Sequence, residues 1–581
     1  MEPQVAALVF AVIFSVGLVF QHYDRRRAAA AVQGLAFAFV LGFMPWKTVV
    51  AVCRFLPGTR HVPLAKIRLV WGEVSAAFGL IVALGLILRK PMGGRQRQWD
   101  APRGAGNTDK DLGKILGGKP AKEGTLIGVS NGRRRVYLAA PERERHMQVV
   151  GPTRSGKSQL LFALSGQDMR QGMPVFFMEA KGDRSDFDQF LKLAGMAGRE
   201  RDVRYFNPQD PRSMTFNPIR RLPGQDVTEI TNQLARAIGR EPTSKGEAQD
   251  YYRSLDYARM TNMVEVFCAT GREFTLRDCH AYFSSDKARR KALDLCDDRR
   301  AVAAAHADFK GTPDTSGLTS SIRPWTTGNL GRLLNDYSPQ IKLEEVFEQD
   351  QLAYFAVPIG RLQVLANPLG RMAISGLLSV ASARQAASVK PGPASVILDE
   401  FAEFATPVFS SFIATVASAR FWTVLSHQDL GQLKRIEGLN VEAFHSAVFA
   451  NTSGCKVCFK TPAPEDAEFW SAALGTYKTF KDTERYKRSF LGTMGTGEVS
   501  RREVEEFKVH PNLLKSLSPG TALILSQGTH ECLARTAGVA RLLESVAVPE
   551  LAVPRPEPAQ GLDLAAEVHG AQRFNVDGQL V

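Results

Sequence analysis

Three long apolar runs lie within the first ninety residues and predict membrane-spanning helices. Residues 3–20 and 28–44 carry no charge, and residues 69–88 carry only Glu73. About 18 apolar residues are enough for a helix to begin to cross the hydrocarbon core of a bilayer. No basic segment precedes the first run, and Arg25–Arg27 follow it where a cleavable signal peptide would have small residues. We therefore predict a retained membrane region with two or three transmembrane helices.

Beyond residue 145 the pattern changes to short apolar strands that alternate with helical stretches. Strand-like segments occur at Met173–Glu179, Val203–Phe206 and Leu352–Val357, whereas residues 225–345 show successive helical patches separated by Gly and Pro. Continuous apolar strands joined by helices are typical of a parallel sheet that is covered on both faces. The pattern predicts an α/β fold with an inserted all-α domain.

The distribution of charge supports the membrane interpretation more than a nucleic-acid one. The chain has 581 residues and a formal net charge of +14. Residues 1–146 hold 22 basic and nine acidic residues, so they contribute +13 of this excess, and the remaining 435 residues are balanced on average. The cluster Arg89, Lys90, Arg95 and Arg97 after the last apolar run indicates that everything downstream faces the cytoplasm. Three helices would place the amino terminus outside, and two would place it inside.

A phosphate-binding motif follows the first strand of the predicted sheet. Residues 151–158 read GPTRSGKS and match G-x-x-x-x-G-K-[ST], between a short apolar segment and an amphipathic stretch. Glycine lets the backbone curl so that successive N–H groups face phosphate oxygens. Lys157 would bridge the phosphates of ATP, and the Ser158 hydroxyl would coordinate Mg²⁺. The predicted ATP-binding residues are Gly151, Pro152, Thr153, Arg154, Ser155, Gly156, Lys157, Ser158 and Gln159.

An acidic pair supplies the second half of this chemistry. The apolar run Ala394–Leu398 is followed directly by Asp399 and Glu400. At the carboxyl end of a buried strand, Asp399 would hold Mg²⁺ through water, and Glu400 would act as the general base that polarises the attacking water. Lys157 and Asp399 are 242 positions apart, more than two or three βα units require, so a domain must be inserted between them.

These motifs define the predicted domain organisation. In chain order it consists of a transmembrane region (1–92), a basic membrane-proximal stem (93–140), a nucleotide-binding domain (141–224 and 346–545), the inserted all-α domain (225–345) and a flexible, Pro-rich acidic tail (546–581).

The motifs and their order resemble those of the coupling proteins of type IV secretion and conjugation, the TraG/TraD family. Residues 179–183 (EAKGD) are similar to the family's D-P-K-G-D segment, with Glu and Ala in place of Asp and Pro. Residues 321–323 (SIR) and 464–468 (PEDAE) resemble two further family segments, and DEFAEF followed by SARFWTVLSHQ matches the family's order after the acidic pair. The likeness spans about residues 145–540, and the membrane region agrees only in kind.

The resemblance implies a RecA-like core that assembles into hexameric rings and hydrolyses ATP at subunit interfaces around a central channel. Carried over to this chain, Gln428 would sense the γ-phosphate and Arg420 would be the arginine finger that acts on the neighbouring subunit. A guanidinium suits that role because it can meet two phosphate oxygens at once. Lys181 and Asp183 either cap the following helix or line the nucleotide site.

The implied function is that of a multi-pass ATPase of the bacterial inner membrane. It would deliver single-stranded DNA or a relaxase–DNA complex to the components of a type IV secretion channel. An alternative is a coupling-type receptor that mainly recruits protein effectors and uses nucleotide for assembly, but the intact pair Asp399–Glu400 favours the motor. A chromosome-segregation translocase of the FtsK/HerA kind is a third class, which the helical insertion and the DEF segment disfavour.

Two further segments have competing interpretations. Residues 476–490 interleave five cations with four aromatic residues, a pattern that suits single-stranded DNA but is more typical of a solvated surface hairpin. Cys455 and Cys458 lie in a predicted strand, where an offset of three directs the thiols to opposite faces and argues against a redox pair or zinc site.

Overall fold

The computed structural model describes residues 108–569, apart from several short internal segments. The omitted segments are 119–123, 131–133, 242–247, 312–313, 406–412, 414, 434–440, 490–491, 527–529 and 556–557. The three apolar runs predicted to span a membrane therefore lie outside the described residues. The chain divides into two compact units, Met1–Gln96 with Thr479–Val504 and Arg97–Lys478 with Glu505–Val581. The second unit contains the sheet and the helices around it.

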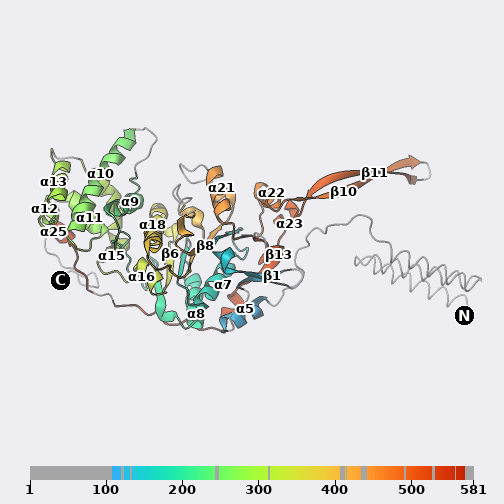
Figure 1. Cartoon of the computed structure of the whole chain (residues 1–581), viewed down its shortest axis with the longest axis horizontal. Coiled ribbons are helices and arrows are strands. Elements are labelled where there is room, and N and C mark those ends of the chain that lie inside the picture. The colour runs from blue at the N-terminus through green and yellow to red at the C-terminus, as the bar shows by residue number, and fades with distance from the viewer. Residues whose placement is uncertain are drawn as a thin grey trace, which may run out of the picture. The chain divides into compact units, whose positions relative to one another are not determined.

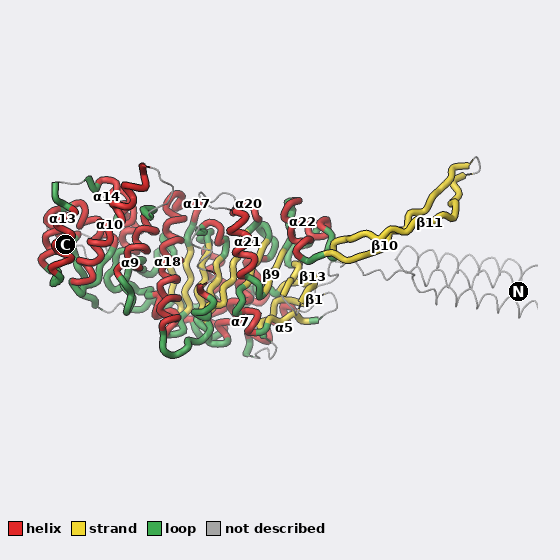
Figure 2. The backbone as a smooth tube through the Cα atoms, turned by 45° about the horizontal axis from the view of Figure 1, so that its top comes forward, coloured by secondary structure: helices red, strands yellow, loops and turns green. Residues whose placement is uncertain are grey.

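Within the described residues, eleven strands of the second unit form one mixed sheet in the order β2-β1-β13-β12-β9-β3-β8-β7-β4-β6-β5. Figure 2 shows these strands side by side in yellow. The parallel strands are β3 (Met147–Val150), β4 (Val175–Glu179), β5 (Val203–Phe206), β6 (Leu352–Ala356), β7 (Ala394–Leu398), β8 (Phe421–His427) and β9 (Cys455–Cys458). The antiparallel extension consists of β1 (Thr125–Ser130), β2 (Arg135–Leu138), β12 (Thr521–Ser526) and β13 (His530–Thr536).

The parallel strands are buried on both faces because helices cover both sides of the sheet. Every residue of β4 is buried, and its side chains alternate between two cores. Phe176 and Met178 pack in one core with Phe355, whereas Val175 and Phe177 pack in the other with Tyr354. This alternation follows from the two-residue period of a strand. Doubly covered strands have few polar positions, which explains why the sequence shows them as nearly continuous apolar runs.

The helices associated with the sheet come from both halves of the chain. They are α5 (Thr108–Leu116), α6 (Ala140–Arg143), α7 (Lys157–Arg170), α8 (Arg184–Met196), α16 (Leu343–Glu348), α17 (Ile359–Leu362), α18 (Ala366–Ala386), α20 (Leu430–Leu433), α21 (Val441–Asn451), α22 (Pro464–Ala473), α23 (Pro511–Lys515) and α24 (Ala540–Leu543), with the 3₁₀ turns η1 (Glu200–Asp202), η3 (Gln363–Leu365) and η4 (Phe401–Glu403).

The segment between β5 and α16 contains only helices among its described residues, beyond isolated bridges. They are α9 (Val227–Ile238), α10 (Ala248–Ala269), α11 (Leu276–Ser284), α12 (Asp286–Asp294), α13 (Arg299–Asp308), α14 (Ser316–Ile322), η2 (Arg323–Trp325) and α15 (Gly328–Leu334). Figure 1 shows these helices gathered beyond α18. Met260 and Phe267 of α10 belong to the same hydrophobic core as Phe176 and Phe355 of the sheet. The helical part therefore shares a core with the sheet and belongs to the same compact unit.

One helical stretch in the described residues, Ile359–Ala386, is apolar and long enough to cross a membrane by length and composition. It comprises α17, η3 and α18, and more than half of its most apolar window is buried inside the protein. Leu369, Ala373 and Leu377 of α18 pack in the core that the helical part shares with the sheet. We therefore interpret this stretch as a core helix.

The structure differs from the prediction of a basic stem over residues 93–140. Helix α5 and strands β1 and β2 lie in this segment, and β1 pairs with β13 at the antiparallel end of the sheet. Leu126 and Ile127 are fully buried. The basic composition of the segment concealed two short strands: β2 pairs with β1, and β1 pairs with β13 about 400 residues further along the chain.

The described residues beyond 546 include a packed segment, where the composition predicts a flexible tail. Leu562 and Leu564 are fully buried against the helical part. The backbone N–H of Leu562 donates to the carbonyl oxygen of Glu273 at 2.8 Å, and Glu567 in α25 (Ala565–His569) pairs with Lys287 and Lys291 of α12. Figure 1 shows α25 beside α11 and α12. The apolar residues of this Pro-rich tail follow no periodic pattern, so only the receiving surface reveals that Leu562 and Leu564 are buried.

The first unit is described through part of one hairpin. Strands β10 (Thr476–Ser489) and β11 (Gly492–Phe507) pair as a two-stranded sheet whose base belongs to the second unit. At the base, the Tyr477 hydroxyl donates to Glu506 at 3.3 Å. Further along, the Arg501 guanidinium lies over the Phe480 ring at 5.7 Å from its centroid.

Candidate nucleotide-binding site

The parallel strands bring the predicted phosphate-binding and acidic residues to one edge of the sheet. Val150 at the end of β3 pairs with His427 at the end of β8, and Leu398 at the end of β7 pairs with Leu425 of β8. The residues that follow β3, β7 and β8 therefore meet at the carboxyl edge. Ligands of open α/β sheets bind at this edge, because the loops and helix N-termini converge there.

The loop 151–156 wraps around the N-terminus of α7, which begins at Lys157. Gly156 has φ 112°, and a Cβ atom there would lie 3.1 Å from the backbone of Gly520 and 3.2 Å from the Phe459 ring. A Cβ atom on Gly151 would lie 2.6 Å from the Cβ atom of Phe459. Both glycines are therefore required by close packing as well as by backbone conformation. The loop is held from outside by the Gly520 N–H, which donates to the Ser155 carbonyl at 2.7 Å.

Ser158 and Asp399 lie together, as a shared Mg²⁺ site requires. The Ser158 hydroxyl donates to Asp399 Oδ2 at 3.2 Å, and the Ser426 hydroxyl donates to Asp399 Oδ1 at 2.7 Å. Asp399 is almost fully buried. Hard oxygen ligands of this kind suit Mg²⁺, which proteins commonly hold through one or two carboxylates together with phosphate oxygens. The residues present therefore fit a Mg²⁺–nucleotide complex.

Glu400 lies between Lys157 and Gln428. Its Oε1 is 3.5 Å from Lys157 Nζ and accepts a hydrogen bond from Gln428 Nε2 at 3.2 Å. Lys157 Nζ also donates to the Gly151 carbonyl at 2.5 Å. Burial raises the pKa of Glu400 above its ordinary value, although Lys157 opposes the shift. A carboxylate with a raised pKa is a stronger proton acceptor, which is the property that a general base needs.

Glu400 adopts a backbone conformation that non-glycine residues rarely take, with φ 55° and ψ 42°. It is the residue immediately before η4, and the Glu403 N–H donates back to its carbonyl at 3.0 Å. Residues in the left-handed region persist only where the surrounding structure fixes them, and they cluster at functional sites. The turn directs the Glu400 side chain toward the loop rather than along the strand.

Seven of the nine predicted loop residues, all except Gly151 and Ser155, line a cavity of about 200 Å³. Its walls are Pro152, Thr153, Arg154, Gly156, Lys157, Ser158, Gln159, Lys181 and Glu400. The side chain of Gln159 has structural partners, since its Oε1 accepts from the N–H groups of Val539 and Ala540 at 3.1 and 2.7 Å. Gln159 thus ties α7 to the turn before α24.

Arg420 and Gln428 lie at opposite ends of β8. Gln428 is at the carboxyl edge beside Glu400, whereas Arg420 precedes the strand at the amino edge. There, Arg420 donates to the Pro391 carbonyl at 3.1 Å and lies 3.5 Å from Glu144. A residue that acts on a neighbouring subunit need not approach its own nucleotide site. The role of Arg420 as a finger therefore stays a proposal.

The polar residues of the segment 179–183 have two kinds of role: Glu179 and Asp183 stabilise the local backbone, and Lys181 enters the site. Asp183 caps α8, because its side chain accepts from the Ser185 N–H at 2.9 Å. Lys181 points into the site, with Nζ 3.2 Å from Ser158 Oγ and 3.5 Å from Asp399 Oδ2. Glu179 is buried and accepts from the Lys181 N–H at 2.6 Å. Burial raises the pKa of Glu179 to about 8.

Sequence reasoning missed Ser426 and left Lys181 undecided. Ser426 is the penultimate residue of β8 and holds the Asp399 carboxylate. A hydroxyl one or two positions before the end of an apolar strand, next to the strand with the acidic pair, is the signal that would have found it. From the sequence alone, either Lys181 or Asp183 could enter the site or cap the following helix. The structure decides this, because α8 begins directly after Asp183 and Asp183 caps it.

The other predicted segments have structural roles in the described residues. Ile322 of the SIR segment is buried in the core, and the Ser321 hydroxyl accepts from Arg240 Nε at 3.1 Å. Pro464 begins α22. Cys455 and Cys458 pack in two different cores, which confirms that their thiols face opposite sides of the sheet.

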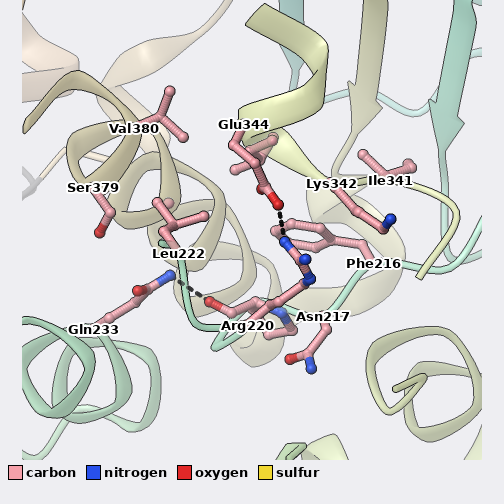
Figure 3. Close-up of a pocket in the computed structure, with 13 residues that line it drawn as sticks. Phe216, Asn217, Arg220, Leu222, Gln233, Ile341, Lys342, Glu344, Ser379 and Val380 are labelled. Carbon is pink, nitrogen blue, oxygen red and sulfur yellow. Dashed lines mark hydrogen bonds and ion pairs between the residues drawn. The ribbon is translucent and has the colours of Figure 1, made fainter. Parts of the chain in front are cut away.

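Figure 3 shows a second, much smaller cavity where the helical part meets the sheet. It measures about 20 Å³, the space of roughly one water molecule, and Arg220 and Glu344 form an ion pair across it. Its small volume and paired charges indicate a structural joint.

Comparisons with known proteins support the coupling-protein resemblance. A family model described as the TraM recognition site of TraD and TraG matches residues 393–519, the segment that contains Asp399, Glu400 and Gln428. The type 4 coupling protein DotL of Legionella pneumophila is 22% identical over 442 residues, which cover 64% of this chain and 55% of DotL. The resemblance to the type IV coupling proteins is thereby confirmed. The chain spans about half the length of DotL.

The likeness to coupling proteins extends to solved structures. The plasmid coupling protein TrwB in complex with a non-hydrolysable ATP analogue superposes with a TM-score of 0.50 at 15% identity, over 81% of this chain and 99% of TrwB. TrwB in complex with ADP and Mg²⁺ gives a TM-score of 0.49 at 15% identity, over 80% of this chain and 98% of TrwB. At this identity the first comparison supports the fold, a mixed α/β core with a large parallel sheet.

Proposed function

We propose that the chain is a Mg²⁺-dependent ATPase of the coupling-protein kind. The observation that carries the proposal is the convergence of Lys157 and Ser158 at the start of α7 with Asp399 and Glu400 after β7, at one edge of the sheet. Ser158 and Asp399 would hold Mg²⁺, which would neutralise charge on the β- and γ-phosphates. Lys157 and the N–H groups of the loop would bind the same phosphates.

Glu400 is the residue proposed to separate hydrolysis from mere binding. Its Oε1 already has two partners, Lys157 and Gln428, which fix the carboxylate beside the phosphate cavity. Glu400 would orient the attacking water and accept its proton, and burial makes it a better acceptor at neutral pH. Gln428, bonded to Glu400, would report the presence of the γ-phosphate to β8.

The coupling role would place this ATPase at the bacterial inner membrane, below a type IV secretion channel. The resemblance to DotL and the family match over 393–519 support this role. The proposal includes a multi-pass anchor formed by the amino-terminal apolar runs, a homo-hexameric ring in which Arg420 acts across the subunit interface, and a single-stranded DNA or relaxase–DNA substrate. Whether the substrate is DNA or a protein effector is the part that an experiment must decide.

The test is the ATPase activity of the detergent-purified full chain, with and without single-stranded DNA. We expect Mg²⁺-dependent hydrolysis that DNA stimulates in a ring verified by electron microscopy. Lys157→Ala should lose nucleotide affinity as well as turnover. Hydrolysis that DNA leaves unchanged in a verified ring would favour the receptor for protein effectors, and absence of hydrolysis would contradict the ATPase itself.

The hairpin β10–β11 is the proposed DNA contact. Phe480 is largely exposed, whereas the side chains of 482–490, which include three of the five cations, lie outside the described residues. Each phosphate that a cation neutralises contributes about 0.7 to the salt slope of single-strand binding. Replacing the five cations Lys478, Lys481, Arg485, Lys487 and Arg488 should lower that slope. An unchanged slope would remove the hairpin from the DNA path.

A further inference from the structure

Lys181 contacts both groups that are proposed to hold Mg²⁺. Its Nζ donates to Ser158 Oγ at 3.2 Å and lies 3.5 Å from Asp399 Oδ2, and these two oxygens are themselves 3.2 Å apart. The ammonium, the hydroxyl and the carboxylate therefore form a closed triangle at the carboxyl edge of the sheet. Asp399, Asp186 and Glu400 raise the pKa of Lys181 against the effect of burial, so the side chain is a cation at physiological pH.

The backbone of Lys181 is fixed independently of these contacts. The buried carboxyl of Glu179 accepts from the N–H groups of Lys181 and Gly182 at 2.6 and 2.9 Å. Gly182 has φ 72°, and Asp183 caps α8 immediately afterwards. The loop thus presents the Lys181 side chain from a rigid base. The side chain itself is 40% exposed and lines the phosphate cavity, so it has room to move from the carboxylate toward a bound phosphate.

An ammonium and a divalent cation cannot share these two oxygens. Mg²⁺ takes its oxygen ligands at about 2.0–2.1 Å in a nearly octahedral arrangement. A metal ion held by Ser158 and Asp399 would be repelled by the Lys181 ammonium, because both are cations and Lys181 contacts both of these residues. For phosphate binding, the Lys181 ammonium and the metal ion act in the same direction, because both attract the phosphate oxygens.

We infer that Lys181 competes with Mg²⁺ for Ser158 and Asp399, and that it binds the nucleotide phosphates when it leaves them. Lys181 is then a positioning residue that makes metal binding and phosphate binding interdependent. It lowers the affinity of the site for Mg²⁺ and raises the affinity for nucleotide in the absence of metal. This inference rests on the proposed nucleotide site and assigns a role that sequence reasoning left open.

The test compares Lys181→Met with the wild-type chain by direct binding of a fluorescent ADP analogue. Two quantities are measured, the ADP affinity in EDTA and the Mg²⁺ concentration that gives half of the metal-dependent change in fluorescence. Removing the charge should lower the Mg²⁺ midpoint and weaken metal-free ADP binding, each by up to about fivefold, the effect of one partly exposed charge contact. Lys181→Arg, which keeps the charge, should stay closer to wild type in both.

The controls separate this competition from a structural effect. Lys390→Met removes an exposed lysine far along the chain and should change neither quantity. A Mg²⁺ midpoint that is unchanged or higher in Lys181→Met would overturn the inference, as would equal weakening of ADP binding with and without metal. If Lys181→Met fails to fold, the same comparison with Lys181→Gln decides. Wild-type protein that binds no ADP would overturn the proposed function together with the inference, whereas intact binding with an unmoved midpoint overturns the inference alone.

Discussion

Helix α7 has a charged cluster near each end, and the two clusters differ in how completely their charges are paired. At its N-terminus, Lys157 is 3.5 Å from Glu400 and Lys181 is 3.5 Å from Asp399, beside an open cavity. Toward its C-terminus, Asp168 receives two hydrogen bonds from the Arg143 guanidinium at 2.8 and 3.2 Å. Both of those side chains are at most 1% exposed.

The difference indicates what each cluster does. The closed cluster at the amino edge is completed by the Thr125 hydroxyl and by the Trp422 ring, which lies 5.2 Å from the Arg143 guanidinium carbon. Its charges are satisfied within the protein, so it fixes β1 and α6 against α7. The open cluster has long contacts and room for phosphate, so its charges are available to a ligand. One helix therefore carries a structural pair and a binding site about three turns apart.

Glu400→Gln gives the largest expected effect and tests the open cluster. The amide keeps the size of the side chain but cannot accept a proton. Turnover should fall by about 10²-fold or more, the usual contribution of a general base, while ATP binding persists. Steady-state hydrolysis and nucleotide binding measure the two effects. Glu403→Gln, three residues further along, is the matched control, and near-normal turnover in Glu400→Gln would mean that the base has been misassigned.

Asp168→Asn tests the closed cluster. Removing one partner leaves the buried Arg143 guanidinium uncompensated, which should destabilise the protein by about 3–5 kcal/mol. The double variant Arg143→Met, Asp168→Leu should lose much less, because no buried charge remains. Thermal unfolding measures stability, and ADP affinity at a temperature where the variant is folded should not change. A loss of ADP affinity comparable to that of Lys157→Ala would show that the two clusters are not separate in function.

Leu564→Ala tests a second closed contact, between the tail and the helical part. The Leu564 side chain is fully buried, and its N–H donates to Asp278 at 2.8 Å. Truncation should leave a cavity and cost about 3 kcal/mol. Hydrogen exchange should show the loss mainly in α11 and α12. Val553→Ala, at an exposed position of the same tail, should change little, and equal effects of the two variants would mean that the tail is not anchored at Leu564.

His146→Asn gives the smallest expected effect at neutral pH and concerns the pH dependence of stability at the amino edge. His146 precedes β3, and its Nδ1 accepts from the Thr423 N–H at 3.3 Å. Burial lowers the pKa of His146 to about 4. The unfolded chain binds the proton first, so His146 should cost stability as pH falls from about 6.5 to about 4, by up to roughly 1.4 kcal/mol per pH unit.

Asparagine tolerates the φ of 60° at position 146 and does not titrate, so it isolates the histidine from other groups. Thermal unfolding between pH 4 and pH 7 should show a shallower acid limb for His146→Asn than for wild type. Burial of Glu179 gives the opposite pH dependence of stability. Because burial raises the pKa of this carboxyl to about 8, the folded protein loses stability as pH rises from about 4.5. Parallel acid limbs for wild type and variant would show that His146 does not contribute.

The elements that were predicted best are those whose sequence pattern does not depend on which other elements pack against them. Strands β4 and β7 are buried on both faces, so their apolar runs identify them without any knowledge of the partners. The loop 151–158 was equally clear, because its glycines and Lys157 serve a local backbone geometry. Strand β1 escaped prediction because its burial depends on β13, far away in the chain.

The sequence by itself determined the chemistry of the site: a phosphate-binding loop, an acidic pair after a buried strand, and a helical segment between them. Only the tertiary structure decided how the charges are shared. Arg143 and Asp168 are 25 positions apart with no motif to join them, and the packing of α7 beneath β1 brings them together. Lys181 and Asp183 differ by two positions, yet the start of α8 assigns one to the site and the other to the helix. Local motifs record which groups a reaction needs, whereas the pairing of buried charges depends on distances that the fold alone sets.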